Sequence, residues 1–268
     1  MEFEFGETKQ SNAFFDRHPD FYAAFEQLMN LANGCFARAS RPRNRAEDVC
    51  FSIGHTCRED YLELLFLAVN GYGPGASKLL RGLFERAVTL AYIVKHPDKA
   101  ERFVHFAAIQ EHKLMNAALQ IVTEEAFDSG MRDPENTVAK IRERYQQYKT
   151  EFEVTQCRDC GRKGTAISWD RDLAAMVHSV GEPYKAYYFG AYALPNLHVH
   201  ATVASMFDGT ETDVRAERRL SDADFALMHA TFVFLDVLRK QNELFQLGLD
   251  IDTCERLFAA VWAAPPSA

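Results

Sequence analysis

The sequence lacks the excess of basic residues that is typical of proteins binding along a nucleic-acid backbone. Its 30 Lys and Arg residues are outnumbered by 38 Asp and Glu residues, so the formal net charge is −8 at pH 7. Neutralisation of phosphates supplies most of the affinity in such complexes. This charge balance argues against binding along a nucleic-acid backbone, and no DNA binding is expected. Two short basic clusters, at residues 41–45 and 158–163, are interpreted as solvated loops.

Long apolar runs and export signals are also missing. No stretch approaches the roughly 20 apolar residues needed to span a bilayer. The N-terminus, Met1-Glu2-Phe3-Glu4-Phe5, is acidic and shows no basic region followed by an apolar run. We therefore expect a soluble, cytoplasmic protein with no membrane association. Most of the six cysteines are isolated, and without an export signal they are expected to be buried thiols rather than disulfides.

Strand patterns are scarce, as are glycine and proline, with 14 and 9 residues. Helical periodicity recurs along almost the whole chain, which predicts an all-α bundle with no β-sheet of consequence. We expect one helical domain over 19–263, between an N-terminal extension (1–18) and a tail (264–268). The predicted helices, about nine, span residues 19–38, 47–70, 75–95, 97–127, 134–155, 169–180, 183–207, 221–247 and 251–263.

Two predicted helices carry charged residues beside their apolar faces. Arg81 and Glu85 lie one turn apart at the edge of a core-facing stripe, where they form either a partly buried polar network or a solvated ion pair. Glu111 is the only charged residue on an apolar seam that includes Leu114. If Glu111 is buried, it needs a cationic or hydrogen-bonding partner or a raised pKa. Arg81 is the candidate partner, because a tight connection joins the two helices; alternatively, Glu111 reaches water.

The segment from Tyr184 to Thr202 is the densest polar and aromatic patch of the chain. Tyr184, Tyr188 and Tyr192 recur every four residues, and Asn196 and His200 follow. Histidine suits acid–base chemistry near neutral pH, and an Asn one turn earlier could orient the imidazole or a phosphate. A hydrogen-bonded interior histidine is the alternative interpretation.

Cys157 and Cys160 form the one closely spaced cysteine pair, and Gly161 follows them. This spacing is similar to half of a zinc knuckle. A structural zinc ion needs four ligands, and a second Cys-x-x-Cys pair is missing. The pair could therefore bind zinc with distant His or Cys ligands, take part in dimerisation, or belong to an ordinary loop. No other cofactor is expected.

Several of these motifs together resemble the bacterial family catalogued as domain of unknown function 5677. The similar region spans residues 45–210, and the resemblance implies a helical fold without an established activity. The motifs are the run from Gly75 to Tyr92 with its Leu-Arg-x-x-x-Glu pattern, His96-Pro97-Asp98, Trp169, Gly181-Glu182-Pro183-Tyr184, Tyr188 and His200-Ala201-Thr202.

A more distant resemblance is to the HEPN helical bundles, which include metal-independent ribonucleases of toxin and phage-defence systems. The hallmark of those enzymes is an Arg a few residues before a His. The resemblance implies that these groups meet across a dimer and act on an RNA 2′-hydroxyl and phosphate. Asn196 and His200 are similar to the second half of the motif. Tyr192 and Ala193 stand where the Arg is expected.

The first functional hypothesis is a HEPN-like ribonuclease that acts as a homodimer on RNA. His200 would be the acid–base group, Arg81 would contact the phosphate, and Glu85 would orient Arg81. The groups that would bind the substrate are Asn196, Tyr188, Tyr192 and Glu111.

The second hypothesis is a non-catalytic bundle that binds a ligand or a partner. In this case Arg81, Glu85, Glu111 and His200 form a buried polar cluster. The acidic composition and the missing Arg of the HEPN motif favour this second hypothesis. Both hypotheses require that ionisable groups from separate helices meet inside the bundle.

Overall fold

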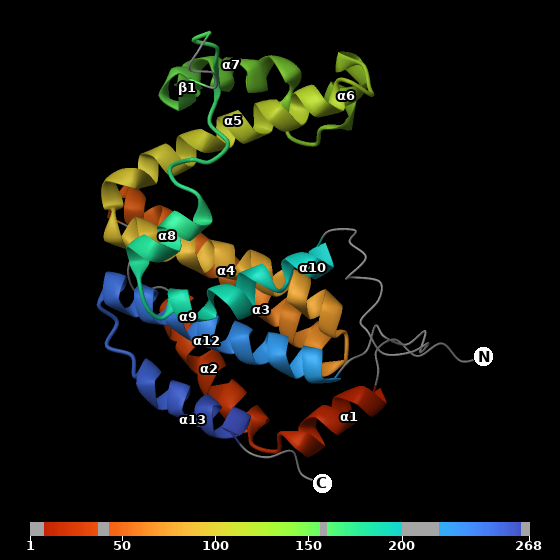
Figure 1. Cartoon of the computed structure of the whole chain (residues 1–268), viewed down its shortest axis with the longest axis vertical. Coiled ribbons are helices and arrows are strands. Elements are labelled where there is room, and N and C mark those ends of the chain that lie inside the picture. Colours follow the sequence, from red (N-terminus) through yellow and green to blue (C-terminus); the bar gives the residue numbers. More distant parts are fainter. Residues whose placement is uncertain (1–7, 37–42, 156–159, 200–219, 264–268) are drawn as a thin grey trace, which may run out of the picture. The chain divides into compact units, whose positions relative to one another are not determined.

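The computed structural model describes residues 8–36, 43–155, 160–199 and 220–263 (Figure 1). Within these ranges the chain is almost entirely helical, and its one sheet is a pair of three-residue strands. The prediction of an all-α fold without a β-sheet of consequence is therefore confirmed. Among the described helices, none combines the length and the apolar character that crossing a bilayer requires.

The chain divides into two compact units. Unit 1 combines residues 1–96 with 173–268, and unit 2 is the continuous segment 97–172. The expectation of one domain over 19–263 stays a prediction, because compactness does not decide whether the units unfold together.

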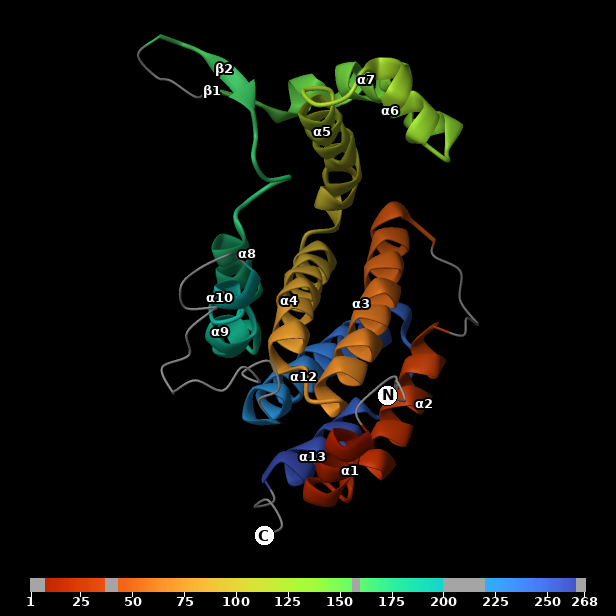
Figure 2. The ribbon, with the colours of Figure 1, turned by 90° about the vertical axis from the view of Figure 1, so that its right-hand side faces the viewer.

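Unit 1 is built around three long helices, with shorter helices packed on them. Its elements are α1 (Thr8–Arg17), α2 (Phe21–Phe36), α3 (Arg45–Val69), α4 (Gly73–Lys95), α8 (Leu173–Val180), α9 (Tyr184–Tyr188), the π-helical turn η4 (Phe189–Ala193), α10 (Asn196–Val199), α12 (Leu220–Phe245) and α13 (Ile251–Ala263). Helix α12 packs against both α3 and α4, while α8, α9 and α10 are grouped beside α4 (Figure 2). Tyr61 of α3 stacks on Phe234 of α12 in the buried centre.

Local signals set the start of α3 and the turn between α3 and α4, which are two of the three long helices of unit 1. Asn44 caps α3 by accepting a hydrogen bond from the Glu47 backbone N–H at 3.0 Å. The Glu47 carboxylate accepts one from the Arg43 backbone N–H at 2.7 Å, an arrangement related to the capping box. Gly71, with φ of 80°, then makes the turn that lets α4 begin at Gly73.

Unit 2 has a small core of its own. Its elements are the 3₁₀ turn η1 (Pro97–Lys99), α5 (Ala100–Ala118), α6 (Glu124–Gly130), η2 (Pro134–Asn136), α7 (Val138–Tyr148), η3 (Lys149–Phe152) and the antiparallel strands β1 (Glu153–Thr155) and β2 (Lys163–Thr165). Met115 of α5 packs with Val138 and Ile141 of α7, and Leu119 and Phe127 cover them.

Several segments differ from the predicted helices. Residues 8–17, assigned to the extension, form α1, whose Phe14 is buried against Phe21. The helix predicted over 97–127 ends at Ala118, since the next residues include β-branched Ile121, Val122 and Thr123, and Thr123 caps α6. The end of the helix predicted over 134–155 is strand β1, which contains β-branched Val154 and Thr155.

Candidate functional site

The structure brings Arg81, Glu85 and Tyr192 together on one face of unit 1. Arg81 and Glu85 form an ion pair on α4 with an N–O distance of 3.0 Å, and their side chains are 24% and 42% exposed. The Arg81 guanidinium carbon also lies 5.3 Å from the centre of the Tyr192 ring on η4. These three predicted residues therefore form a half-exposed cluster rather than a buried one.

Tyr188 and Asn196 lie close to this cluster. The Tyr188 and Tyr192 rings are 5.3 Å apart. Asn196 begins α10, which packs against α4, and its Oδ1 atom is buried without a hydrogen-bond partner among the described residues. His200 lies outside the described residues. Its predicted approach to Arg81 therefore stays a prediction.

Glu111 pairs with a different cation from the one that the sequence indicated. On α5, its carboxylate accepts two hydrogen bonds from Arg144 of α7, at 2.7 and 3.0 Å. The expected partner, Arg81, binds Glu85 instead. The reason is that the predicted seam is not the buried face of α5: Leu114 is 71% exposed, and Met115 packs into the core of unit 2. A role of Glu111 in substrate binding stays a prediction.

The predicted zinc ligands are only partly described. Cys160 is exposed and carries a free thiol, and Cys157 lies outside the described residues. Both belong to the connection between β1 and β2. Within the described part of the chain, no group of three or more His, Cys, Asp or Glu side chains could hold a metal. Zinc at this pair remains a proposal, which elemental analysis of the purified protein would test.

A pocket of about 550 Å³ lies elsewhere in unit 1, between α4, the α8–α9 connection, α12 and α13. Apolar parts of its wall come from Ala91, Val94, Val180 and Pro183. Pockets of this size hold small molecules, and a few well-placed polar groups usually orient the ligand.

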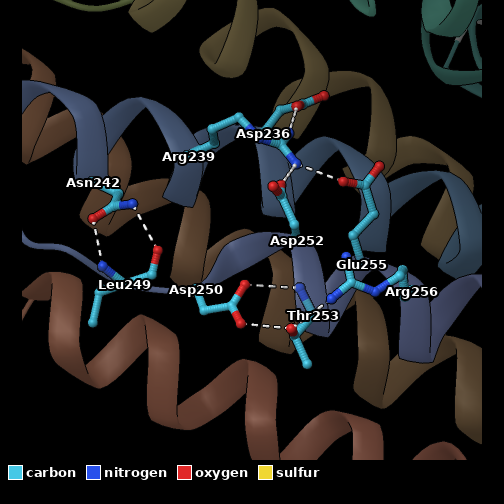
Figure 3. A network of polar contacts seen from close by, with 9 residues as sticks. All are labelled: Asp236, Arg239, Asn242, Leu249, Asp250, Asp252, Thr253, Glu255 and Arg256. Carbon is cyan, nitrogen blue, oxygen red and sulfur yellow. Dashed lines mark hydrogen bonds and ion pairs between the residues drawn. The ribbon is translucent and has the colours of Figure 1, made fainter.

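The polar part of the pocket is organised around Arg239 of α12 (Figure 3). Its guanidinium donates to Asp236, one turn earlier on α12, and to two carboxylates of α13: Asp252 at 3.2 Å and Glu255 at 2.5 Å. Asp236, Arg239 and Glu255 line the pocket. Because donor and acceptors are ionisable groups of opposite charge, these are charge-assisted hydrogen bonds, which are stronger than neutral ones.

Hydrogen bonds within the connection between α12 and α13 fix the start of α13, which carries two of these four side chains. The Asn242 side chain accepts from the Leu249 backbone N–H and donates to the Leu249 carbonyl, each at 2.9 Å. Asp250 accepts from the backbone N–H of Thr253 at 3.1 Å and from its hydroxyl, which fixes the start of α13. The α13 carboxylates are thereby presented to α12.

Asp236 is the most unusual group of the pocket. The residue is 5% exposed, and its Oδ2 atom has no hydrogen-bond partner among the described residues. Burial raises the pKa of Asp236 to about 6; the nearby Arg239 opposes this rise, and Glu255 adds to it. Perturbed carboxyl groups in a pocket are candidates for a functional role.

Two tyrosines of α9 line the pocket beside Asp236. Tyr184 is 1% exposed, and its hydroxyl has no described hydrogen-bond partner. Burial, followed by the Asp236 charge, raises the pKa of the Tyr184 phenol well above its ordinary value. The same two causes raise the pKa of Tyr187 to about 12. Both phenols therefore stay protonated near neutral pH and can donate or accept hydrogen bonds.

Of these pocket residues, Tyr184 was predicted from its sequence pattern, whereas Asp236, Arg239 and Glu255 were not. A usable signal was present: Asp236 is the lone charge in the run Phe232-Val-Phe-Leu-Asp-Val-Leu238. A carboxylate among consecutive buried apolar residues needs a partner or a raised pKa.

Comparisons with known proteins identify one family. A model of a family of unknown function (DUF5677) matches residues 49–215. No curated protein and no solved structure matches the chain. The matched region contains Arg81, Glu85 and Tyr184, and it ends before Asp236. The pocket is therefore lined by α4, α8 and α9, which lie within the matched region, and by α12 and α13, which lie after it.

Proposed function

The chain belongs to this family of unknown function, and we propose that it is a ligand-binding helical protein whose site is the pocket at Asp236 and Tyr184. One observation supports this proposal most directly. Asp236 Oδ2 and the Tyr184 hydroxyl oxygen are buried, have no hydrogen-bond partner among the described residues, and belong to side chains that line the pocket. Leaving a buried polar group unpaired costs about 1–3 kcal/mol. A bound ligand that pairs with these atoms would recover that cost.

The Arg81–Glu85 pair supports ligand binding less strongly than the pocket does. Both side chains reach solvent, and the pair already satisfies part of its own hydrogen-bonding capacity. Exposed ion pairs of this kind contribute little free energy, typically below about 1 kcal/mol. The groups around Asp236 are a different set from the polar cluster expected from the sequence, which comprised Arg81, Glu85, Glu111 and His200.

Four small aromatic probes with different head groups test the proposal: benzylamine, benzoate, phenyl phosphate and benzyl alcohol. Saturation-transfer NMR should detect binding of at least one probe to the wild-type chain. Val94→Trp should abolish the signal, because the indole would occupy the pocket. Leu114→Trp adds the same ring at an exposed position of unit 2 and should leave the signal intact. If no probe distinguishes the wild type from Val94→Trp, the proposal fails.

A second candidate function is a HEPN-like, metal-independent ribonuclease that acts as a homodimer on RNA in the cytoplasm, in phage defence or as a toxin. One arrangement favours it. Arg81 contacts Tyr192, and α10, which packs against the same helix as Arg81, ends at Val199, immediately before His200. In this proposal His200 exchanges protons with the RNA 2′-hydroxyl, and Arg81 contacts the phosphate.

Cleavage of total RNA in the presence and absence of a chelator tests this second candidate. The wild type should cleave under both conditions. His200→Ala should lower the rate by about 10²–10⁴-fold, the usual contribution of a general acid–base group. His55→Ala, which removes a half-exposed histidine of α3, should not change it. Undiminished cleavage by His200→Ala would rule out the proposed role.

A further inference from the structure

In the pocket of unit 1, the direct ionic contacts of Arg239 join one guanidinium to more than one carboxylate. Asp236, Asp252 and Glu255 all bind Arg239, so three carboxylates surround one cation. Asp236 and Glu255 line the pocket, whereas the side chain of Asp252 is 74% exposed. Two further cations, Lys95 and Lys240, also belong to the pocket wall.

The other cations of the pocket wall already have partners. Lys95 donates to the Ser179 carbonyl, and Lys240 donates to Glu243 at 2.8 Å. Both terminal nitrogens of Arg239 donate to carboxylates. An anionic ligand would thus meet cations that already have partners, together with the carboxylates of Glu182, Asp236 and Glu255, which is unfavourable in a partly buried site.

The available groups of the pocket are a carboxylate oxygen and a phenol hydroxyl, and both can accept hydrogen bonds. The Oδ2 atom of Asp236 and the hydroxyl oxygen of Tyr184 are buried and lack described partners. The Tyr184 and Tyr187 side chains also belong to the wall, and tyrosine rings attract cations. Ala91, Val94 and Val180 add apolar surface for the rest of a ligand.

From these features we infer that the pocket recognises a small organic cation, a primary ammonium or guanidinium group carried on an apolar body. The inference rests on the proposed ligand-binding function and specifies its ligand class. The cationic head donates to Asp236 Oδ2 and to the Tyr184 oxygen. The apolar body lies against Ala91, Val94 and Val180. One added positive charge partly balances the three carboxylates around Arg239.

Binding should depend on pH through Asp236. The charged and titratable groups that line the pocket with it are Arg239 and Lys240 on its own helix, Glu255 from α13, Tyr184 and Tyr187 from α9, Glu182 before α9, and Lys95 from α4. Burial places the pKa of Asp236 at about 6. The carboxylate is ionised above that pH and neutral below it. The affinity for a cation should therefore fall as the pH is lowered from 7.5 to 5.

The experiment compares the same four probes by NMR titration at pH 7.5. Benzylamine should bind the wild type more tightly than benzoate, phenyl phosphate or benzyl alcohol. Asp236→Asn should weaken benzylamine binding at least about tenfold, as expected when a buried charge partner is lost, and should remove the pH dependence. Asp222→Asn removes the same charge from the first turn of α12, outside the pocket wall, and should bind as the wild type does.

Tyr184→Phe provides a second test that does not depend on the folding of Asp236→Asn. It keeps the ring and removes only the hydroxyl, and it should weaken benzylamine binding by several-fold. Tighter binding of benzoate or phenyl phosphate than of benzylamine would overturn the inferred ligand class while leaving the ligand-binding function intact. Absence of binding by all four probes would refute both.

Discussion

At the residue scale, Asp236 shows how a single desolvated carboxyl group affects folding and binding together. The residue lies among Val233, Phe234, Val237 and Leu238, all fully buried on α12. Its proximity to Arg239 offsets only part of the cost of moving its charge out of water, since burial outweighs that interaction and leaves the pKa raised. The burial of Asp236 is therefore better explained by a role in ligand binding than by a contribution to stability.

The raised pKa of Asp236 predicts an inverse dependence of stability on pH. The folded group has a pKa of about 6 and the unfolded group one near 3.8, so the folded chain binds more protons between these values. Stability is therefore lost as the pH rises through this window, by roughly 3 kcal/mol for a shift of about two units. Urea unfolding of the wild type and of Asp236→Asn, measured from pH 4 to 7, tests this prediction. The difference between their free energies of unfolding should change across this pH range.

The direction of that change is specific. The free energy of unfolding of the wild type should decrease relative to that of Asp236→Asn as the pH increases, because only the wild type has the titrating carboxyl. A difference that stays constant from pH 4 to 7 would mean that Asp236 titrates as it does in the unfolded chain.

Sequence patterns predicted the Arg81–Glu85 contact but not the partner of Glu111. The first pair is fixed by helical spacing within α4, so local geometry is sufficient. The pairing of Glu111 with Arg144 depends on how α7 packs along α5, and the choice of the buried face of α5 was wrong. The network around Arg239 likewise joins two helices, and no spacing rule connects Asp236 with Glu255.

At the element scale, helix ends were predictable where short-range signals set them. Helices α3, α4, α12 and α13 lie close to their predicted ranges, with a cap at Asn44 and a turn at Gly71. The helix predicted over 183–207 is divided, within its described part, into α9, the π-helical turn η4 and α10. Gly190 within η4 packs against the imidazole of His229 from α12, a tertiary contact that periodicity does not reveal.

The close packing of α3 against α12 gives a prediction for Gly54. An added Cβ atom at this position would lie 2.4 Å from the Gln241 side-chain nitrogen, which donates to the Cys50 carbonyl at 2.7 Å. Alanine favours a helix by about 1 kcal/mol over glycine, but overpacking a buried contact costs about 1–3 kcal/mol. Gly54→Ala should therefore lower the free energy of unfolding of the chain, measured by urea titration.

Gly130→Ala is the matched control for this substitution. It also replaces a helical glycine, but nothing lies within 4 Å of the added Cβ atom. The control should change stability by less than about 1 kcal/mol. Equal effects of the two substitutions would contradict a steric origin at Gly54.

At the scale of the whole molecule, the helical class followed from composition and periodicity, whereas the division into two units did not. Residues 97–172 are as helical in pattern as their neighbours, and no flexible linker sequence marks either boundary. The division depends on which apolar residues share a core. Met115, Val138 and Ile141 form a buried cluster within unit 2, whereas the buried residues of α3, α4 and α12 belong to unit 1.

Separate cores predict that unit 2 can be destabilised without unit 1. Ile141 is 5% exposed and packs with Met115 and Val138. Replacing a buried Ile with Ala costs about 2–5 kcal/mol through lost burial and the cavity that remains. In Ile141→Ala, hydrogen exchange read by mass spectrometry should accelerate in α5 and α7, while α3, α4 and α12 keep their wild-type protection. Benzylamine binding to the unit 1 pocket should also persist. Equal loss of protection in all five helices would instead mean that residues 19–263 unfold as one cooperative domain.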